Sequence, residues 1–476
     1  MPFPANKTKI VCTIGPASDS PAILEKMIRA GMNIVRLNFS HGDFAGHQAT
    51  IQKIRAASRT TGRRVAIMAD LPGPKMRIGQ FEEEPIELKP DEPFTLTTAE
   101  LVGDATRVSV SFPRLPQTVK PGDKLFLNDG LVQMEVAQVQ GNDVHCKVLV
   151  GGELRSRKGL NLPGIDLGIR AFTDHDYDCL KFALANEVDA VSQSFVETGE
   201  DITAVRKAAS ELGHEPFIIA KIERARACNQ TAEILAAADG IMIARGDLGV
   251  EIPIESIAVV QKQIMRQANL MGKPVITATQ MLESMTHNRR PSRAEATDVA
   301  NAILDGTDCV MLSGESAMGN YPIEATSMLA RIAAAIEPHR AVHPIETALS
   351  SCRQDGDIPL KDLIALSVQT ILNRMTPPTV IVPTRSGATA RSIARFRLPV
   401  WITAVSRLAQ TCQNLLFSYG VFPVQEPEHP DDWKKWTRDW LQTMGEAGER
   451  VVLTEGPSAK HPYRNNRMEI LDLSRT

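Results

Sequence analysis

The sequence predicts an α/β protein, a (β/α)8 TIM barrel with a small β-barrel domain inserted in one loop and a separate α/β domain at the C-terminal end. Three observations lead to this fold class. Short apolar runs alternate with helix-like segments eight times between residues 9 and 312. The alternation stops over residues 79–161, where brief alternating runs are separated by Pro-Asp, Pro-Gly and Asn-Asp-Gly turns. A second strand and helix pattern follows residue 357.

Three strand and helix units precede the insertion. The first helix is expected to begin after Ser20-Pro21, a hydroxyl N-cap followed by proline at the first helical position, and to end at Gly31. The second helix is expected over 43–60, and the third strand leads into Asp70. The strands themselves are expected over residues 9–14, 33–37 and 65–69.

A helix near 174–186 resumes the alternation, and five more apolar strands follow it. They are expected over residues 190–194, 217–220, 240–244, 274–279 and 309–312. The active site of such a barrel lies at the carboxyl ends of its strands. The polar residues expected at those ends are Arg36, Asn38, Asp70, Gln193, Ser194, Lys221, Glu223, Arg245, Asp247, Thr279, Gln280, Ser313 and Glu315.

Length and composition limit the class of protein. A chain of 476 residues is too long for one ordinary core. The expected domains are the barrel over 1–73 and 167–342, the inserted β domain over 74–166, and the C-terminal domain over 343–476, after a join at 343–357. A net charge of −3 without a basic run argues against nucleic-acid binding.

Targeting signals and cysteine usage point to one compartment. The sequence has no leader pattern at its start and no apolar stretch that could span a membrane, so a cytoplasmic protein is expected. Its seven cysteines, an odd number without Cys-x-x-Cys spacing, are expected to be packing residues rather than disulfides or zinc ligands.

The strands at 217–220 and 240–244 carry the clearest chemistry. Lys221 and Glu223 follow the first strand, and Arg245 and Asp247 follow the second. Two carboxylates suit Mg²⁺ or Mn²⁺, which keep coordination positions open for phosphate oxygens. Two carboxylates beside two cations are typical of a site that moves a phosphoryl group.

A second phosphate site is expected in the C-terminal domain. The strand at 379–382 leads through hydroxyl, guanidinium and glycine residues into a helix. Hydroxyls and backbone N–H groups at a helix start hold phosphate, although an ordinary N-capped turn uses the same residue types. The loop residues are Thr384, Arg385, Ser386, Gly387 and Thr389. Further along, Trp433, Trp436 and Trp440 share one helix face and are expected in the core or at a subunit contact.

Five motifs, taken together, resemble the pyruvate kinase family along nearly the whole chain. They are Arg36-Leu-Asn-Phe-Ser-His-Gly42, Ala220-Lys-Ile-Glu223, residues 241–253, Ala278-Thr-Gln-Met-Leu-Glu-Ser-Met285 and Met311-Leu-Ser-Gly-Glu315. The resemblance implies a barrel, a lid domain, a regulatory C-terminal domain and a homotetramer. It also implies the final reaction of glycolysis, in which phosphoenolpyruvate and ADP give pyruvate and ATP.

The resemblance implies roles for individual residues. Glu223 and Asp247 would hold the divalent ion, while Lys221 and the guanidinium groups of Arg36 and Arg77 would neutralise the transferring phosphoryl group. The substrate carboxylate would lie at the backbone of Gly246 and Asp247, after Arg245. Thr279, with Ser313 behind it, would belong to the relay that protonates the enolate. Asn38, His41, Arg77 and Lys158 would contact the nucleotide phosphates, Lys158 arriving with the lid.

One segment departs from the family pattern. Potassium-dependent members carry Asp-Thr-Lys-Gly-Pro-Glu-Ile-Arg-Thr, whereas this chain has Asp70-Leu-Pro-Gly-Pro-Lys-Met-Arg-Ile78. Lys75 is therefore expected to replace the monovalent cation near Asn38, Ser40, Asp70 and Leu71, so that K⁺ is not required. The alternative is that Lys75 faces solvent at the lid hinge.

Other functions and the effector remain as alternatives. A metal-dependent barrel lyase or aldolase acting on pyruvate enolates would share Glu223 and Asp247, but it would need neither lid nor nucleotide. A sugar-phosphate sensor without turnover would not need Lys221 and Thr279. The resemblance implies a phosphorylated sugar or a nucleoside monophosphate as activator. Because residues 454–466 lack a second basic, glycine-containing phosphate loop, a sugar monophosphate or AMP is expected rather than a bisphosphate.

Overall fold

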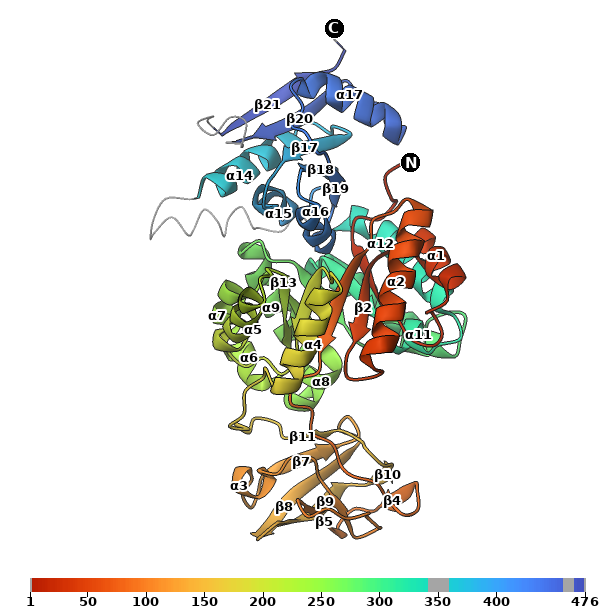
Figure 1. The fold of residues 1–476 in the computed structure, drawn as a ribbon, viewed down its shortest axis with the longest axis vertical. Coiled ribbons are helices and arrows are strands. Elements are labelled where there is room, and N and C mark those ends of the chain that lie inside the picture. Colours follow the sequence, from red (N-terminus) through yellow and green to blue (C-terminus); the bar gives the residue numbers. More distant parts are fainter. Residues whose placement is uncertain (1, 341–358, 457–465, 475–476) are drawn as a thin grey trace.

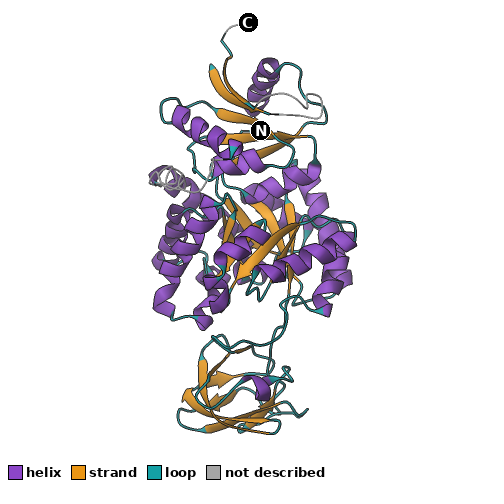
Figure 2. Ribbon diagram, turned by 90° about the vertical axis from the view of Figure 1, so that its left-hand side faces the viewer, coloured by secondary structure: helices purple, strands orange, loops and turns teal. Residues whose placement is uncertain are grey.

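The computed structural model describes residues 2–340, 359–456 and 466–474. Three parts follow one another along its long axis (Figure 1). The closed barrel lies in the middle, the inserted β domain at one end and the C-terminal α/β domain at the other (Figures 1 and 2). The expected join over 343–357 lies outside the described residues. Within the described ranges, no helix combines the length and apolarity needed to cross a membrane.

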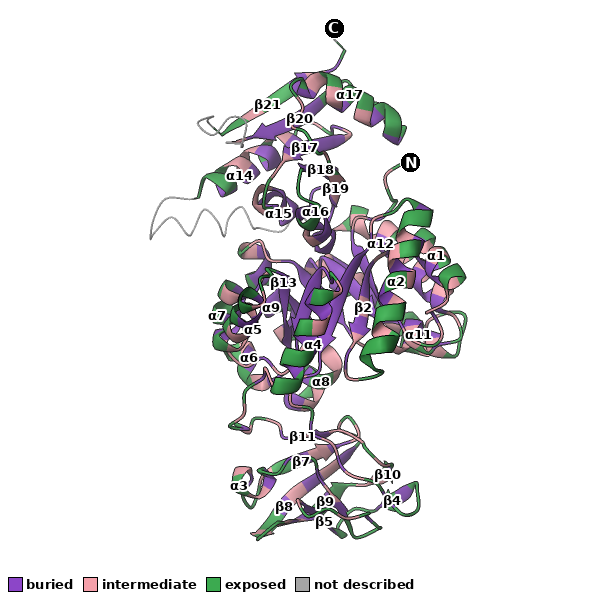
Figure 3. Ribbon diagram, in the orientation of Figure 1, coloured by how far each residue is buried: buried purple, intermediate pink, exposed green. Residues whose placement is uncertain are grey.

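The barrel consists of eight parallel strands in the order β1-β16-β15-β14-β13-β12-β3-β2, which confirms the expected fold class. Its strands are almost entirely buried, as Figure 3 shows. The strands are β1 (Lys9–Thr13), β2 (Met32–Asn38), β3 (Ala66–Leu71), β12 (Ala190–Gln193), β13 (Phe217–Ile222), β14 (Gly240–Ala244), β15 (Val275–Ala278) and β16 (Cys309–Leu312).

Two strands run further than the sequence predicts. β3 and β13 each extend two residues beyond the expected ends, so that Asp70 and Lys221 belong to the strands instead of following them. The neighbouring strands supply the backbone pairing: Asp70 lies opposite Asn38 on one side and Ser192 on the other. Their charged side chains are consequently held by rigid backbone rather than by loops.

Helices surround the barrel, and the predicted caps are in place. The Ser20 hydroxyl caps the first helix by accepting the N–H of Ile23, and Gly31 ends it with φ 128°. The longer helices are α1 (Pro21–Ala30), α2 (Phe44–Thr61), α4 (Asp174–Ala185), α5 (Gly199–Glu211), α7 (Thr231–Ala237), α9 (Ile257–Leu270), α10 (Arg293–Asp305) and α12 (Pro322–Ile336). Three short helices, α6 (Ala225–Asn229), α8 (Arg245–Glu251) and α11 (Gly314–Ala317), follow strands directly.

The inserted domain leaves the barrel after β3 and returns before α4 (Figure 1). It has its own apolar core, which includes Phe94 and Leu96. A six-stranded sheet in the order β11-β7-β8-β9-β5-β6 lies beside a pair, β10-β4. Its elements are β4 (Ile86–Leu88), β5 (Pro93–Thr97), β6 (Arg107–Ser109), α3 (Leu115–Thr118), β7 (Lys124–Leu127), β8 (Val132–Gln140), β9 (Asp143–Val150), β10 (Gly152–Leu154) and β11 (Leu160–Asn161).

The C-terminal domain is a five-stranded sheet in the order β19-β18-β17-β20-β21, antiparallel only between β20 and β21. Trp433 is buried in its core and Trp436 and Trp440 pack against that core, as expected. Its elements are α14 (Leu360–Leu372), β17 (Thr379–Pro383), α15 (Ala388–Ala394), β18 (Trp401–Ser406), α16 (Ala409–Asn414), β19 (Val421–Gln425), α17 (Trp433–Met444), β20 (Arg450–Glu455) and β21 (Arg467–Asp472).

The C-terminal domain closes one end of the barrel. Phe417 is fully buried and stacks on Phe217 of β13, with ring centroids 5.3 Å apart. Beside it, Arg397 donates hydrogen bonds to both oxygens of Asp308, the residue before β16. The site must therefore lie at the opposite end, where the strands finish and the inserted domain begins.

Candidate active site

A buried ammonium group lies at the carboxyl end of the barrel. Lys221, near the end of β13, donates a hydrogen bond from Nζ to Ser194 Oγ over 2.6 Å. The same Nζ lies 3.2 Å from Glu223 Oε2 and 3.6 Å from Asp70 Oδ2. Ser194 follows the neighbouring strand β12, and Asp70 lies on β3, one strand further round the barrel, so the closed sheet brings these groups together.

Asp70 is the centre of a second set of contacts. Arg36, on β2, donates two hydrogen bonds to Asp70 Oδ2, from Nε at 2.9 Å and from Nη2 at 2.5 Å. Ser192 donates to the other oxygen at 2.6 Å. Arg36 also donates to Thr13 Oγ1 at 3.1 Å. Asp70 thereby fixes the predicted phosphate-binding guanidinium of Arg36 at the barrel mouth.

The charges in this cluster depend on one another. Burial alone disfavours a charged Lys221, but the carboxylates of Asp70 and Glu223 outweigh it and raise the pKa of the lysine. Burial also acts against a charged Asp70, yet Lys221 and Arg36 prevail and hold its pKa below the ordinary value. At Glu223, burial raises the pKa, and the negative charge of Asp247 adds to this effect against the attraction of Lys221.

The pKa of Glu223 is raised chiefly because its carboxylate is buried. Its Oε1 accepts the N–H of Phe195 at 2.7 Å, while the buried Oε2 has no hydrogen-bond donor among the described residues. Asp247, in the first turn of α8, is exposed. No group of three or more His, Cys, Asp or Glu residues that could hold a metal ion occurs in the described part of the chain. Two carboxylate ligands suit Mg²⁺ when a substrate supplies oxygens to the remaining coordination positions of the ion.

Thr279, after β15, lies in a strained conformation. Its φ is 69°, in the left-handed region that a β-branched residue rarely adopts. Its Oγ1 accepts the N–H of Gly246 at 2.7 Å, and Arg245 donates to its carbonyl oxygen at 3.0 Å. Arg245 is held in turn by Asp298. The Ser313 hydroxyl, expected behind Thr279, is buried and has no hydrogen bond to Thr279 or to another described residue.

Several positive charges lie where the barrel meets the inserted domain. Burial and the charges of Lys75, Arg77 and Arg36 lower the pKa of His41. Burial, and next the charge of Arg77, lower the pKa of Lys75, against the attraction of Asp247 and then of Glu223. Lys75 is therefore within electrostatic reach of both candidate metal ligands.

The remaining predicted nucleotide contacts are spread between two domains. Asn38 ends β2, and its Oδ1 accepts the N–H of Ser40 at 3.1 Å. Arg77 donates to the carbonyl oxygen of Arg157, within the inserted domain, at 2.8 Å. Lys158 is the next residue, and its carbonyl oxygen accepts the N–H of Ile78. Arg77 and Lys158 thus lie on two adjacent segments of the inserted domain, which an isolated bridge between Arg77 and Gly159 joins, whereas Asn38 lies on the barrel.

The loop before α15 borders a large pocket. The pocket has a volume of about 910 Å³ and is lined by Thr384, Arg385, Ser386 and Thr389, together with Arg407, Lys361, Trp433, Glu426 and Glu428. Gly387 caps α15 with φ 80°, and a Cβ there would lie 2.8 Å from Arg391 Nη1 and 2.9 Å from Leu415 Cδ2, so a larger residue would be strained in this turn. Its N–H donates to Thr384 Oγ1 at 2.9 Å. The structure does not describe most of residues 454–466, the segment that lacks a second phosphate loop in the sequence.

Comparisons with known proteins agree with this architecture. A family model for the pyruvate kinase barrel domain matches residues 5–326, and one for the pyruvate kinase alpha/beta domain matches residues 362–471. The chain belongs to the pyruvate kinase family. It is accordingly a phosphotransferase. A pyruvate kinase of Thermococcus litoralis is 43% identical over 99% of this chain and 100% of its own length.

Two further pyruvate kinases extend the comparison. That of Geobacillus stearothermophilus is 40% identical over 98% of this chain and 80% of its own length. A crystal structure of a pyruvate kinase from Cryptosporidium parvum superposes with a TM-score of 0.90 at 35% identity, covering 98% of this chain and 96% of that one. The likeness therefore includes the lid and the C-terminal domain as well as the barrel.

Sequence reasoning missed several residues beside the site. Arg224, Glu251 and Asp298 are charged and form ion pairs next to predicted site residues. Arg224 directly follows the Lys-Ile-Glu motif, and Glu251 ends the segment that carries Asp247. The positions of Arg224 and Glu251 beside the motifs were visible in the sequence, but the contact between these two residues was not.

Proposed function

We propose that this member of the pyruvate kinase family catalyses Mg²⁺-dependent or Mn²⁺-dependent transfer of a phosphoryl group from phosphoenolpyruvate to ADP, giving pyruvate and ATP, as a cytoplasmic homotetramer. The observation that carries the proposal is the buried Lys221 ammonium, 3.2 Å from Glu223 in the same barrel mouth as Arg36. Phosphoryl transfer needs positioned positive charge more than it needs a covalent intermediate.

Lys221 and Arg36 stabilise the charge on the moving phosphoryl group. Asp70 holds Arg36 in place and keeps Lys221 charged, so both cations are positioned before substrate binds. Arg245 and the backbone at Gly246 and Asp247 receive the substrate carboxylate. Preorganised charge of this kind lowers the barrier because it needs no rearrangement during the reaction.

Glu223 and Asp247 would hold the divalent ion, whose positive charge binds substrate oxygens and offsets their repulsion. The support is the buried Oε2 of Glu223, which lacks a hydrogen-bond donor among the described residues, and the exposed carboxylate of Asp247. The ammonium of Lys221 compensates one negative charge of this group. The two carboxylates and this ammonium therefore keep one net negative charge, which suits a divalent cation.

Departure of the phosphoryl group leaves an enolate that takes a proton at carbon. Thr279 belongs to this step through its hydroxyl, which the Gly246 N–H holds at the barrel mouth. A threonine hydroxyl is too weak an acid to supply the proton alone, so it passes one from water. Ser313 extends the relay, because its buried hydroxyl makes no hydrogen bond to another described residue and can bond to a water molecule.

The lid completes the nucleotide site. Asn38 and His41 contact the ADP phosphates from the barrel, and Arg77 and Lys158 contact them from the lid. Because these residues belong to different domains, closure of the lid assembles the site. It also excludes water that would otherwise accept the phosphoryl group.

Lys75 takes the place of a monovalent cation, and the enzyme needs no K⁺. The support is its electrostatic reach to Asp247 and Glu223, together with its position where dependent relatives carry glutamate. An added K⁺ beside this ammonium would meet a repulsion of ~4 kcal/mol at ~4 Å and an effective dielectric constant of about 20. Asn38, Ser40, Asp70 and Leu71 would surround the replaced ion.

The pocket at 384–389 binds an activating sugar monophosphate or AMP. The hydroxyls of Thr384, Ser386 and Thr389 border it beside Arg385, and they suit one phosphate group. Glu426 and Glu428 border the same pocket and favour hydroxyl or amino groups over a second phosphate.

A coupled assay tests the reaction. Pyruvate formation from phosphoenolpyruvate, measured with lactate dehydrogenase, is expected only with both ADP and Mg²⁺. Cleavage of a pyruvate-containing substrate without ADP would indicate the lyase or aldolase instead, and effector binding without turnover would indicate the sensor.

The variant Lys221→Met separates the two chemical steps. Phosphoryl transfer is expected to fall by about 10³-fold or more, because the charge on the moving group loses its partner. Exchange of tritium from labelled pyruvate, which reports enolate protonation, should remain measurable. If both steps kept wild-type rates, the role of Lys221 would be wrong.

A further inference from the structure

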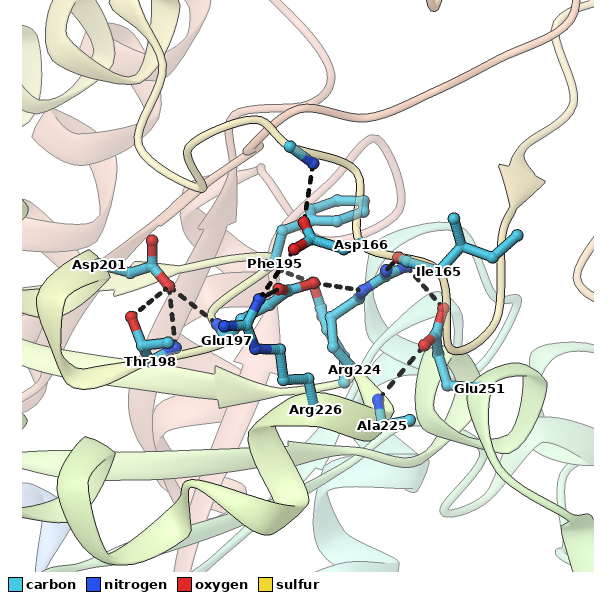
Figure 4. Close-up of polar contacts among 12 residues, drawn as sticks. Ile165, Asp166, Phe195, Glu197, Thr198, Asp201, Arg224, Ala225, Arg226 and Glu251 are labelled. Carbon is cyan, nitrogen blue, oxygen red and sulfur yellow. Dashed lines mark hydrogen bonds and ion pairs between the residues drawn. The ribbon is translucent and has the colours of Figure 1, made fainter. Parts of the chain in front are cut away.

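The segment that returns from the lid is held by a buried guanidinium next to a candidate metal ligand (Figure 4). Arg224, adjacent to Glu223, donates from Nη2 to the carbonyl oxygen of Ile165 at 2.9 Å. It donates from Nη1 to Glu251 at 2.7 Å and from Nε to Glu197 at 3.2 Å. Its side chain is only 4% exposed, so all three edges of the guanidinium are used inside the protein.

Glu251 connects the same contact to the second candidate metal ligand. It closes α8, whose first turn carries Asp247. Its Oε2 accepts the N–H of Ala225 at 3.3 Å. The pair formed by Arg224 and Glu251 therefore joins the loop after β13 to α8 and holds both to the lid segment at Ile165.

The outgoing lid segment meets the same group of loops. Phe195 donates its N–H to Glu223 Oε1 at 2.7 Å and adopts a φ of 59°. A Cβ at Gly73, on the outgoing segment, would lie 2.8 Å from the Phe195 ring, so the ring packs closely against this connection. Glu197, which accepts from Arg224, lies two residues further along the same loop. Both connections to the lid thus contact loops that carry or hold Glu223.

These contacts are of the kind that fixes geometry. Lysine cannot replace a buried arginine that makes three directed hydrogen bonds without losing some of those bonds, because an ammonium lacks the planar fork of a guanidinium. Removing one member of such a pair leaves the other charge buried without compensation. Residues that orient metal ligands typically change metal affinity 10–100-fold when they are altered.

We propose that Arg224 and Glu251 are positioning residues that set the separation of Glu223 and Asp247 and tie both to the lid hinge at Ile165, so that metal binding orders the hinge. The inference rests on the proposed function, because it takes Glu223 and Asp247 as the metal ligands. Neither Arg224 nor Glu251 is expected to touch substrate.

The test uses Mn²⁺ as the probe on the full-length protein. Binding of Mn²⁺ to metal-stripped protein is measured by electron paramagnetic resonance, and hydrogen exchange of peptides covering residues 160–172 is compared with Mn²⁺ and with EDTA. The variants are Arg224→Lys and Glu251→Gln. The matched control is Arg226→Lys, the same substitution two residues away, in a side chain that is 51% exposed and pairs with Glu197 and Asp166 at 3.3 and 3.4 Å.

Wild type and Arg226→Lys are expected to bind Mn²⁺ within twofold of each other and to show slower hinge exchange when Mn²⁺ is bound. Arg224→Lys should bind Mn²⁺ about 10-fold more weakly and lose the slowing at the hinge. Glu251→Gln should weaken Mn²⁺ binding and reduce the slowing of hinge exchange to a smaller extent. If Arg224→Lys does not fold, the result for Glu251→Gln tests the proposal. In steady-state assays, the apparent Mn²⁺ activation constant should rise more than kcat falls at saturating Mn²⁺.

Two results overturn the proposal, and they are distinguishable. If Glu223→Gln binds Mn²⁺ as wild type does, the metal site itself is wrong and the inference falls with it. If Glu223→Gln loses Mn²⁺ but Arg224→Lys and Glu251→Gln keep both affinity and hinge protection, the proposed function stands and the positioning role is wrong.

Discussion

The contact between the barrel and the C-terminal domain allows a quantitative prediction. Arg397 donates to the two Asp308 oxygens at 2.5 and 2.6 Å, and both side chains are no more than 4% exposed. Arg397→Met would leave the Asp308 carboxylate buried without its cation. Breaking such a pair costs ~3–5 kcal/mol. Because Asp308 keeps the backbone N–H groups of Tyr419 at 2.8 Å and Val275 at 3.0 Å, we expect the lower end, about 3 kcal/mol.

Tryptophan fluorescence reports this loss selectively. All four tryptophans of the chain, Trp401, Trp433, Trp436 and Trp440, lie in the C-terminal domain. Trp401 also lies beside Lys9 of the barrel, with Nζ 4.9 Å from its ring centroid. With a urea m value of roughly 2 kcal/mol/M for a domain of this size, the midpoint of the fluorescence transition should fall by about 1.5 M.

Two further variants make the prediction refutable. Arg374→Met removes an exposed arginine from the same domain and should leave the midpoint unchanged within ~0.3 M. The double variant Arg397→Met with Asp308→Asn removes the unpaired charge and should recover at least half of the loss. A single-variant midpoint equal to that of Arg374→Met would refute the reasoning, and so would a double variant less stable than Arg397→Met.

Three other predictions follow from the site and its surroundings. Activity in potassium-free buffer with tetramethylammonium salt should not rise when KCl is added, whereas Lys75→Glu should create a KCl requirement; a large stimulation of the wild type would contradict the role of Lys75. Ser386→Asp should reduce the ratio of activity with AMP or a sugar monophosphate to activity without it toward one, because a carboxylate repels the phosphate. If fructose 1,6-bisphosphate were the strongest activator of the wild type, the assignment of the pocket to a monophosphate would be wrong. Burial lowers the pKa of Lys9 to about 8. Below pH 8 the folded state therefore carries the free-energy cost of a buried ammonium. As the pH rises from 8 toward 10.5, Lys9 is neutral in the folded state but still charged in the unfolded chain, so this cost disappears. The stability of wild type relative to Lys9→Met, measured by urea unfolding at pH 7.5 and pH 10, should therefore rise by on the order of 3 kcal/mol, and an unchanged difference would show that Lys9 does not titrate in this range.

The sequence by itself determined the order of elements and the barrel end at which the candidate site is expected. Strand and helix periods are local patterns, so the eight barrel strands, the inserted β domain and the turn before α15 were all predictable. Lys221, Glu223 and Asp247 were predictable as candidate site residues because they follow or end apolar strands, and their roles stay predictions. The roles of Lys75 and of the effector loop stay predictions.

The tertiary structure decided which of these residues meet. Asp70 bonds to Arg36 on one side and lies opposite Ser192 on the other, a contact set by the register between neighbouring strands. Arg224 and Glu251 are 27 residues apart, and they meet only because β13 and β14 are adjacent in the closed barrel. Local sequence patterns do not encode such pairings, because side-chain contact across a barrel depends on strand order and register rather than on spacing along the chain.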